Sequence, residues 1–330
     1  MRPFRYEQPA DAVRAVAAAE AGSHYLAGGT TMVDLMKLDV MRPNALIDIS
    51  QLENGRYDFI KWSGDSLRIG ALTPMATLAD DDKVRRRIPV LSDALWLAAS
   101  PQIRNVARIG GNVLQRTRCP YFRDTSYAQC NKREPGSGCA ALDGGVTRGL
   151  AVLGTSEQCI ASYPGDFAQA LVALDAIVEV LGKDGPRSIR FAELHRQPES
   201  RPDLETRLQD GDLITAFSIP DANFARSKYL KVRDRESYAY ALASTAVGLR
   251  MEGETIADIR LGLGGVATVP WRPLEAEAAL RGGPLDEARI VQASEIAFNG
   301  ANPTEENAYK VELGKRTMIR AILETARMEG

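Results

Sequence analysis

The chain has 330 residues, 45% of them hydrophobic and 25% charged, and a formal net charge of −2 at pH 7. This size is typical of about two ordinary domains with cores of their own, and the weak net charge argues against a nucleic acid partner. No apolar run approaches the roughly 20 residues of a membrane-spanning helix, and the first residues lack an apolar stretch, so we expect neither membrane insertion nor an export signal on this chain.

The first fifty residues are expected to form a small unit in which helices alternate with strands. Alanine-rich sequence with apolar residues at helical spacing begins the unit, and Gly22 ends that helix. The predicted elements are a helix over residues 9–21, a strand over 24–27, a helix over 32–38 and a strand over 46–49. A glycine turn, Gly28-Gly29-Thr30, separates the first strand from the second helix.

Residues 56–161 divide into a regular part and an irregular part. The predicted elements of the regular part are a strand over residues 67–70, a helix over 90–99 and a turn at 110–112. Residues 116–161 show little periodicity and contain all four cysteines and several arginines. Because long irregular segments in compact domains are uncommon and usually functional, we interpret this segment as an insertion held together by something other than an apolar core.

The remainder of the chain is expected to alternate between helices and strands and to end in helices. The predicted elements are a helix from residue 166, strands over 177–180, 213–219, 228–232, 241–251 and 256–262, and helices that begin near residues 273, 285 and 304. Residues 220–223, which begin with a proline, are the expected domain boundary. This pattern favours an α+β fold in two domains.

Two glycine turns have the composition of an anion-binding loop. The first contains Leu26, Ala27, Gly28, Gly29, Thr30, Thr31 and Met32, and the second contains Ile109, Gly110, Gly111 and Asn112. Glycine lets the backbone approach a ligand closely, and the free N–H groups at a helix start attract phosphate. The spacing is not that of a Rossmann dinucleotide fingerprint. Two such turns suit a dinucleotide such as FAD, but tight turns without a ligand explain the composition equally well.

The four cysteines lie close together in the sequence, separated by ten, eight and nineteen residues, and are Cys119, Cys130, Cys139 and Cys159. Zinc fingers prefer pairs two to four residues apart, so these spacings require a loop that wraps around its metal. Four thiolates suit an iron–sulfur cluster or a four-cysteine zinc site. Two disulfide bonds are a third interpretation, although a chain with this much core has little need of them.

Few other side chains in the sequence suggest chemistry. There are two histidines, His24 and His195, which excludes a three-histidine zinc site, and we expect both to be structural or surface residues. Lys231, Arg233 and Arg235 lie on or just after a predicted strand. They form either a solvated basic edge, which the spacing alone favours, or a group of cations near a phosphate or a flavin.

The sequence resembles the flavoprotein subunits of the xanthine dehydrogenase and carbon monoxide dehydrogenase family over nearly its whole length. The segments that carry the resemblance, in this order along the chain, are Ala27-Gly28-Gly29-Thr30, Ile103-Arg104-Asn105 followed by Ile109-Gly110-Gly111-Asn112, Leu171-Val172-Ala173-Leu174-Asp175-Ala176 and Leu263-Gly264-Gly265-Val266-Ala267. Their order and combination are more specific than any one of them.

The cysteine segment narrows the resemblance to one group of proteins within this family. In most of the family a Ser-Pro-x-x-Asp element closely follows the second glycine turn, whereas the similar element here, Ser162-Tyr163-Pro164-Gly165-Asp166, comes some fifty residues later. The cysteine segment fills that gap and resembles the one in periplasmic aldehyde oxidoreductase flavoproteins, where it holds a [4Fe-4S] cluster. The similar stretches are Cys119-Pro120-Tyr121-Phe122, Cys130-Asn131-Lys132-Arg133 and Pro135-Gly136-Ser137-Gly138-Cys139.

The resemblance implies a fold and a set of cofactor contacts. The fold would be a two-lobed FAD-binding domain of the vanillyl-alcohol-oxidase (PCMH) type over residues 1–220, with residues 116–161 as an iron–sulfur insertion, and an α+β CO-dehydrogenase-flavoprotein C-terminal domain over residues 221–330. The residues implied to bind FAD are Leu26, Ala27, Gly28, Gly29, Thr30, Thr31, Met32, Val33, Asp34, Ala98, Arg108, Ile109, Gly110, Gly111, Asn112, Asp166, Ile214 and Lys231. The implied cluster ligands are Cys119, Cys130, Cys139 and Cys159. The family usually has Thr or Ser where this chain has Arg108, so we assign no role to that side chain.

The resemblance also implies an activity and partners. Electrons from a molybdenum cofactor in a large subunit, where an aldehyde becomes a carboxylate, would pass through [2Fe-2S] clusters of a small subunit to the FAD of this chain and on to an external acceptor. The three subunits would form a heterotrimer, located in the periplasm by co-export with a partner or otherwise in the cytoplasm. One alternative is the flavoprotein subunit of another hydroxylase or reductase acting on an aryl-CoA, a purine or an N-heterocycle. Another, from a different class, is a non-redox scaffold with structural zinc.

Overall fold

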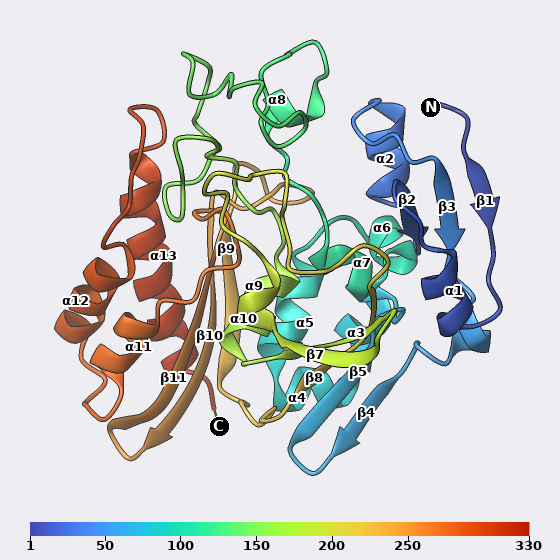
Figure 1. Ribbon diagram of the computed structural model, residues 1–330. Helices are drawn as coiled ribbons and strands as arrows, with labels where there is room; N and C mark the ends of the chain where they lie inside the picture. Colours follow the sequence, from blue (N-terminus) through green and yellow to red (C-terminus); the bar gives the residue numbers. More distant parts are fainter. Residues whose placement is uncertain (330) are drawn as a thin grey trace.

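The computed structural model describes residues 1–329, and Figure 1 shows a chain that folds around three β-sheets. The N-terminal sheet has the strand order β1-β3-β2, and both of its pairings are parallel. Its elements are β1 (Arg5–Glu7), α1 (Ala12–Ala18), β2 (Ser23–Leu26), α2 (Met32–Lys37), β3 (Ala45–Asp48) and the 3-10 helix η1 (Leu52–Gly55). Parallel neighbours need a crossover connection, and α2 supplies it between β2 and β3. The predicted alternation of helix and strand in this unit is confirmed.

A five-stranded antiparallel sheet with the order β4-β5-β8-β6-β7 forms the middle of the molecule. Its strands are β4 (Ile60–Ser63), β5 (Ser66–Gly70), β6 (Ile177–Gly182), β7 (Gly185–Arg190) and β8 (Leu213–Ile219). The helices around it are α3 (Met75–Asp80), α4 (Asp82–Arg87), α5 (Pro89–Trp96), α6 (Pro101–Val106), α7 (Ile109–Val113), α9 (Phe167–Ala173) and α10 (Phe191–Leu194). The largest apolar core lies between this sheet and helices α3, α5 and α9. The alternation expected of a half-buried strand is seen in β5, where Leu67 and Ile69 are buried and Arg68 is exposed.

The predicted turn at residues 110–112 is wrong, because Ile109–Val113 forms the short helix α7. Ile109 and Val113 are four residues apart and both are fully buried, so the apolar face of one helical turn is anchored in the core. The N–H of Asn112 donates to the carbonyl of Arg108 at 2.9 Å and closes that turn. Packing therefore overrides the low helix propensity of Gly110 and Gly111.

The C-terminal sheet is antiparallel, with the order β11-β10-β9. Its strands are β9 (Ser227–Val232), β10 (Ala243–Glu252) and β11 (Thr255–Gly264), and the helices that follow are α11 (Leu274–Leu280), α12 (Glu287–Ala297) and α13 (Tyr309–Ala326). Figure 1 shows these helices on the outer side of the sheet, away from the N-terminal unit. The predicted strands and helices of this region are confirmed. No helix within residues 1–329 is long and apolar enough to span a membrane.

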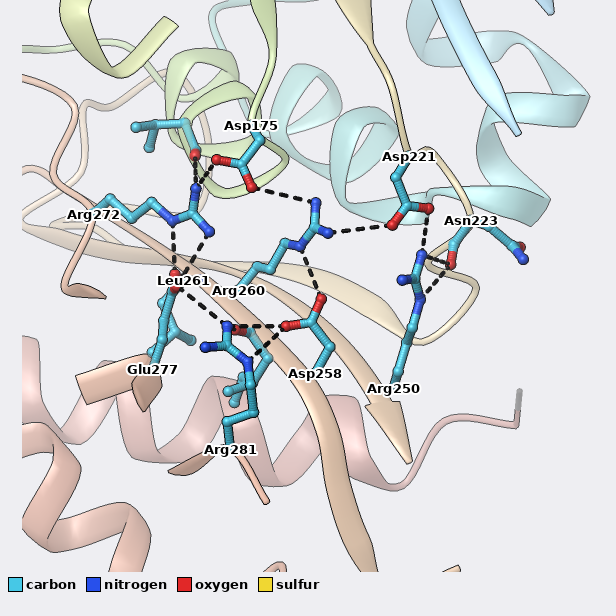
Figure 2. A network of polar contacts seen from close by, with 12 residues as sticks. Asp175, Asp221, Asn223, Arg250, Asp258, Arg260, Leu261, Arg272, Glu277 and Arg281 are labelled. Carbon is cyan, nitrogen blue, oxygen red and sulfur yellow. Dashed lines mark hydrogen bonds and ion pairs between the residues drawn. The ribbon is translucent and has the colours of Figure 1, made fainter. Parts of the chain in front are cut away.

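A network of arginines and carboxylates joins the C-terminal sheet to the rest of the molecule (Figure 2). Arg260 on β11 lies 3.2 Å from Asp221 and 3.5 Å from Asp175, which follows α9. Arg272 contacts Asp175 and also the buried Glu277 of α11, at 2.9 Å. Because these partners come from both sides of the junction, the network fixes the C-terminal sheet against the central part of the chain.

The segment between α7 and α9 is mostly irregular, as predicted, and has one short helix, α8 (Pro120–Arg123). In Figure 1 it is the green segment above the sheets, between the N-terminal unit and the C-terminal helices. Its buried residues, including Phe122, form a small apolar cluster with Leu35 and Val40, which belong to α2 and the turn after it. The insertion therefore rests on the N-terminal unit.

Candidate functional site

The first glycine turn packs directly against the backbone that leads to the second. A Cβ atom on Gly28 would lie 2.2 Å from the carbonyl oxygen of Val106, so this close approach requires glycine. Gly29 has a φ of +72°, in the left-handed region that side chains disfavour. The two turns, about eighty positions apart in the sequence, are therefore neighbours. Thr30, two residues before the start of α2, is exposed.

The second glycine turn is fastened to the end of β5 by its backbone. The N–H of Ile109 donates to Thr73 at 3.1 Å, and the N–H of Gly110 donates to Ala71 at 2.8 Å. A Cβ on Gly110 would lie 2.9 Å from the Ala71 oxygen, whereas a Cβ on Gly111 would meet nothing within 4 Å. Gly110 is thus required for packing, and Gly111 borders open space.

Within residues 1–329, two buried polar atoms at this second turn have no hydrogen-bond partner. They are Nε of Arg108 and Oδ1 of Asn112. Leaving a buried donor or acceptor unpaired costs about 1–3 kcal/mol, so such atoms usually have a ligand or water as partner. A bound group that accepts from one and donates to the other would remove this cost, and the place of these atoms beside Gly111 suits such a group.

Asp166 and Lys231 form an ion pair with almost no solvent access. The ammonium of Lys231 lies 2.8 Å from Oδ2 of Asp166, and their side chains are 1% and 5% exposed. The hydroxyl of Tyr229 donates to Oδ1 of Asp166 at 2.7 Å and lies 2.8 Å from the hydroxyl of Ser244. Burial raises the pKa of the Asp166 carboxyl, and the charge of Lys231 opposes that shift. These contacts connect the start of α9 to β9 and β10.

Two further predicted contacts are Ala98, which follows a residue bonded to Lys231, and Ile214, which precedes a residue bonded to the segment beside the second glycine turn. The carbonyl next to Ala98, that of Leu97, accepts from the Lys231 ammonium at 3.0 Å. The carbonyl of Ala98 accepts from Arg104 on α6 at 2.7 Å, and α6 leads into the second glycine turn. Ile214 on β8 is buried, and the carbonyl of the next residue accepts from Ala71, the residue that holds Gly110. These contacts connect Ala98 with the Lys231 pair and with α6, and Ile214 with the second glycine turn.

The four cysteines line a single small cavity in the insertion. All four are free thiols, which does not fit the interpretation as two disulfide bonds, and three of them are buried. Burial raises the pKa of Cys119 to about 12 and that of Cys159 to about 11, and neighbouring cysteines add to both shifts. The backbone N–H of Ala161 points to Sγ of Cys159 at 3.5 Å. Within residues 1–329, no group of three or more His, Cys, Asp or Glu is arranged to hold a metal ion.

Comparisons with known proteins cover almost the whole chain. The family described as the FAD binding domain in molybdopterin dehydrogenase matches residues 2–222, and the CO dehydrogenase flavoprotein C-terminal domain matches residues 228–325. The chain is 44% identical to the aldehyde oxidoreductase FAD-binding subunit PaoB of Escherichia coli (strain K12), over 98% of each protein. The chain belongs to the FAD-binding subunits of the xanthine dehydrogenase and CO dehydrogenase family.

More distant relatives also match this chain over most of their length. The glyceraldehyde dehydrogenase medium chain of Sulfolobus acidocaldarius is 25% identical over 91% of this chain and 90% of that protein. A crystal structure of the Cu,Mo-CO dehydrogenase matches 99% of this chain and all of its own with a TM-score of 0.77 at 24% identity, which shows a shared fold. The expected fold, an FAD-binding domain followed by a CO dehydrogenase flavoprotein C-terminal domain, is confirmed.

In this member of an FAD-binding family, the groups around the glycine turns are of the kinds that bind a flavin nucleotide. Thr30 in the first turn is exposed, Gly111 in the second borders open space, and the Arg108 Nε at the second turn can donate to a phosphate, whereas Oδ1 of Asn112 can accept from a hydroxyl group. A diphosphate accepts hydrogen bonds from backbone N–H groups and from a guanidinium. The residues present are therefore chemically suited to the cofactor that the family binds.

Several contacts in this FAD-binding subunit were not anticipated from its sequence. The carboxylate of Asp34 pairs with Arg118 and Arg123 of the insertion. Tyr229 supports Asp166, and it lies two positions from Lys231 on β9, where residues two apart share one face of a strand. That spacing was the available signal for Tyr229. The half-buried His195 contacts the Val113 carbonyl through Nε2 at 3.0 Å, which fits the structural role expected of it.

Proposed function

We propose that this chain is the FAD and [4Fe-4S] electron-transfer subunit of a molybdenum-containing aldehyde oxidoreductase. The observation that carries the proposal is the convergence of four free cysteines on one cavity within an insertion of a flavin-binding fold. The 44% identity to an aldehyde oxidoreductase FAD-binding subunit over the full length supports this assignment over other hydroxylases of the family.

In this proposal FAD is held by the two glycine turns and the residues around the Lys231 pair. Residues 26–34 bind the diphosphate through backbone N–H groups, and residues 108–112 form the second binding loop. Asp166 contacts the ribose side, Ile214 and Ala98 pack against the cofactor, and Lys231 lies near the flavin or its phosphates. FAD, when bound, supplies the exchange of one or two electrons, and the chain's residues orient the flavin and adjust its potential.

The cluster is assigned to Cys119, Cys130, Cys139 and Cys159. Metal binding requires deprotonated sulfur, and a buried thiol with a raised pKa becomes a thiolate when a metal compensates its charge. The N–H of Ala161 at Cys159 is the kind of hydrogen bond to sulfur that sets the potential of a cluster. A single zinc ion would draw four sulfurs to about 2.3 Å from one point, whereas a cluster provides a separate iron for each cysteine. That all four cysteines line one cavity supports a site shared by all of them, and the resemblance of this segment to the aldehyde oxidoreductase flavoproteins favours a cluster over zinc.

The proposed partners are a large molybdenum-cofactor subunit and a small subunit with [2Fe-2S] clusters. The similar proteins of known function carry the names FAD-binding subunit or medium chain, which supports a place in such an assembly. We also assign residues 1–220 to the FAD-binding domain and residues 221–330 to the C-terminal domain. We further propose a location in the periplasm by co-export with a partner, which the resemblance of the cysteine segment favours, and otherwise in the cytoplasm.

Co-purification with quantification of molybdenum, iron, zinc and flavin tests this function. The chain is tagged and expressed with the genes that adjoin its own. We expect two partner proteins, molybdenum, one flavin per chain, and a visible spectrum with flavin bands and a broad absorbance that dithionite bleaches. Oxidation of an aldehyde by the complex then tests the substrate class. A colourless protein with one zinc ion per chain would contradict the proposal.

A further inference from the structure

Asp34 links the helix after the first glycine turn to the cysteine insertion. Its carboxylate receives two hydrogen bonds from Arg123, from Nη1 at 2.8 Å and from Nη2 at 3.1 Å. Arg118 donates a third from Nη1 at 3.1 Å. A carboxylate held by two guanidinium groups in this way is a charge-assisted contact with defined geometry. The hydrogen bond from Arg123 lowers the pKa of Asp34, so the carboxylate is ionised at neutral pH.

The two arginines flank the first cysteine of the cavity. Arg118 immediately precedes Cys119, and Arg123 is the last residue of α8, which Cys119 begins as its N-cap. The apolar side of the same contact comes from Leu35, the neighbour of Asp34, which lies in one buried cluster with Cys119 and other residues of the insertion. Polar contacts through the two arginines and apolar contacts through Leu35 therefore both join the neighbourhood of Cys119 to α2.

Arg118 also contacts the C-terminal part of the chain. Its guanidinium lies over the ring of Tyr240 at 4.9 Å from the centroid, in the connection between β9 and β10. This stacking adds to the ion pair with Asp34 and limits the positions available to Arg118. The start of the cysteine segment is thus held between α2 and the β9–β10 connection.

We propose that Asp34 couples the two cofactor sites, so that each bound cofactor strengthens the retention of the other. This rests on the proposed function. Filling the cysteine cavity fixes Cys119 and with it the two arginines, and these hold α2 and the glycine turn in the arrangement that binds FAD. Such coupling is reciprocal by thermodynamic necessity for binding free energies, so bound FAD also strengthens the binding of the cluster. Asp34 is a positioning residue in this account, and its carboxylate need not touch either cofactor.

The test is a double-mutant cycle on the rate of FAD release from the full complex. The four proteins are the wild type, Asp34→Asn, Cys139→Ser and the combination of both. Release is followed by the rise of flavin fluorescence after dilution, and iron loss to a chelator is followed in parallel. We expect Asp34→Asn to speed FAD release about fivefold when the cluster is present, the lower end of typical coupling, and to have no further effect when Cys139→Ser has removed it.

A matched control lies one turn further along the chain. Asp39 pairs with Arg2 and Arg42 at the surface and, among the described residues, forms no hydrogen bond or ion pair with the insertion, so Asp39→Asn should leave FAD release unchanged. An equal effect of Asp34→Asn with and without the cluster would overturn the coupling. Should Asp34→Asn fail to fold, Arg123→Gln removes two of the three hydrogen bonds from the other side. Absence of FAD or iron from the wild type would instead contradict the proposed function, so the two failures are distinguishable.

Discussion

The ammonium of Lys231 lies 2.8 Å from the carboxylate of Asp166, and both side chains are almost completely buried where β9 meets the start of α9. Lys231 also donates to the carbonyl of Leu97. One ion pair therefore connects the C-terminal sheet, the helix after the insertion and the end of α5. Two buried charges are tolerated because each compensates the other and because the Leu97 carbonyl and the Tyr229 hydroxyl supply further hydrogen bonds.

Replacing Asp166 by Asn should destabilise the protein strongly. The change leaves the Lys231 ammonium buried without an anion, and breaking a buried pair in this way typically costs about 3–5 kcal/mol. The free energy of unfolding in urea and the flavin content of the purified protein measure the result. Asp39→Asn, which breaks exposed pairs, is the control and should change neither quantity. Equal stability of the two variants would show that the buried pair contributes nothing.

Replacing Gly28 by alanine should disturb the fold, whereas replacing Gly111 by alanine should not. At Gly28 the added Cβ meets the Val106 carbonyl at 2.2 Å, so we expect separation of the two glycine turns, lower stability and loss of FAD. At Gly111 the added Cβ meets no protein atom within 4 Å, so the fold should be unchanged. A reduced FAD affinity in a stably folded Gly111→Ala protein would place the cofactor against that turn. Full FAD content in Gly28→Ala would contradict the role of the close approach.

The stability of the protein should depend on pH through His195. Burial lowers the pKa of this imidazole from 6.5 to about 4. Between these two pH values the unfolded state therefore binds a proton that the folded state does not. Stability is therefore complete above about pH 6.5 and is lost as the pH falls towards 4.

Comparison with His195→Gln isolates this contribution, since a glutamine amide can still donate to the Val113 carbonyl. Between pH 7 and pH 5 the wild type should lose about 1–2 kcal/mol more than the variant in urea unfolding. Identical pH profiles would mean that the histidine titrates alike in both states.

Replacing Glu277 by Gln should weaken the junction shown in Figure 2. The buried carboxylate accepts from Arg272 at 2.9 Å and from the N–H of Leu261 at 2.8 Å, and its loss leaves a largely buried guanidinium with less compensation. We expect a loss of about 2–3 kcal/mol in the free energy of unfolding. Glu275→Gln, at an exposed position of the same helix, should have little effect. An unchanged free energy of unfolding in Glu277→Gln would mean that apolar contacts, and not this ion pair, stabilise the junction.

Elements with a regular apolar pattern could be predicted from the sequence. The strand Leu213–Ile219 has the predicted bounds, and β5, β6 and β9 lie where alternating or continuous apolar residues indicated them. The edge strand Gly185–Arg190 was not predicted, because proline, serine and two arginines give it no apolar face. Helix α7 was predicted as a turn, because its two glycines obscured the buried pair Ile109 and Val113.

Those parts of the site that depend on residue types close together in the sequence could be predicted. Glycine turns and clustered cysteines can be found from residue type and spacing. The partner of a charged side chain cannot be found in this way. Asp34 and Arg118 are 84 positions apart, and Asp166 and Lys231 are 65 apart, so no local pattern reveals either pair. The convergence of the cysteines on one cavity likewise depends on the folding of the insertion, which carries no periodic signal.

The iron content of Cys139→Ser tests the central claim most directly. The variant and the wild type are purified as complexes with their partners, and iron and flavin are quantified per chain. We expect the variant to lack the iron of one cluster, about four atoms, while it retains FAD and the iron of the partner subunits. Unchanged iron in the variant would contradict the assignment of the four cysteines as cluster ligands.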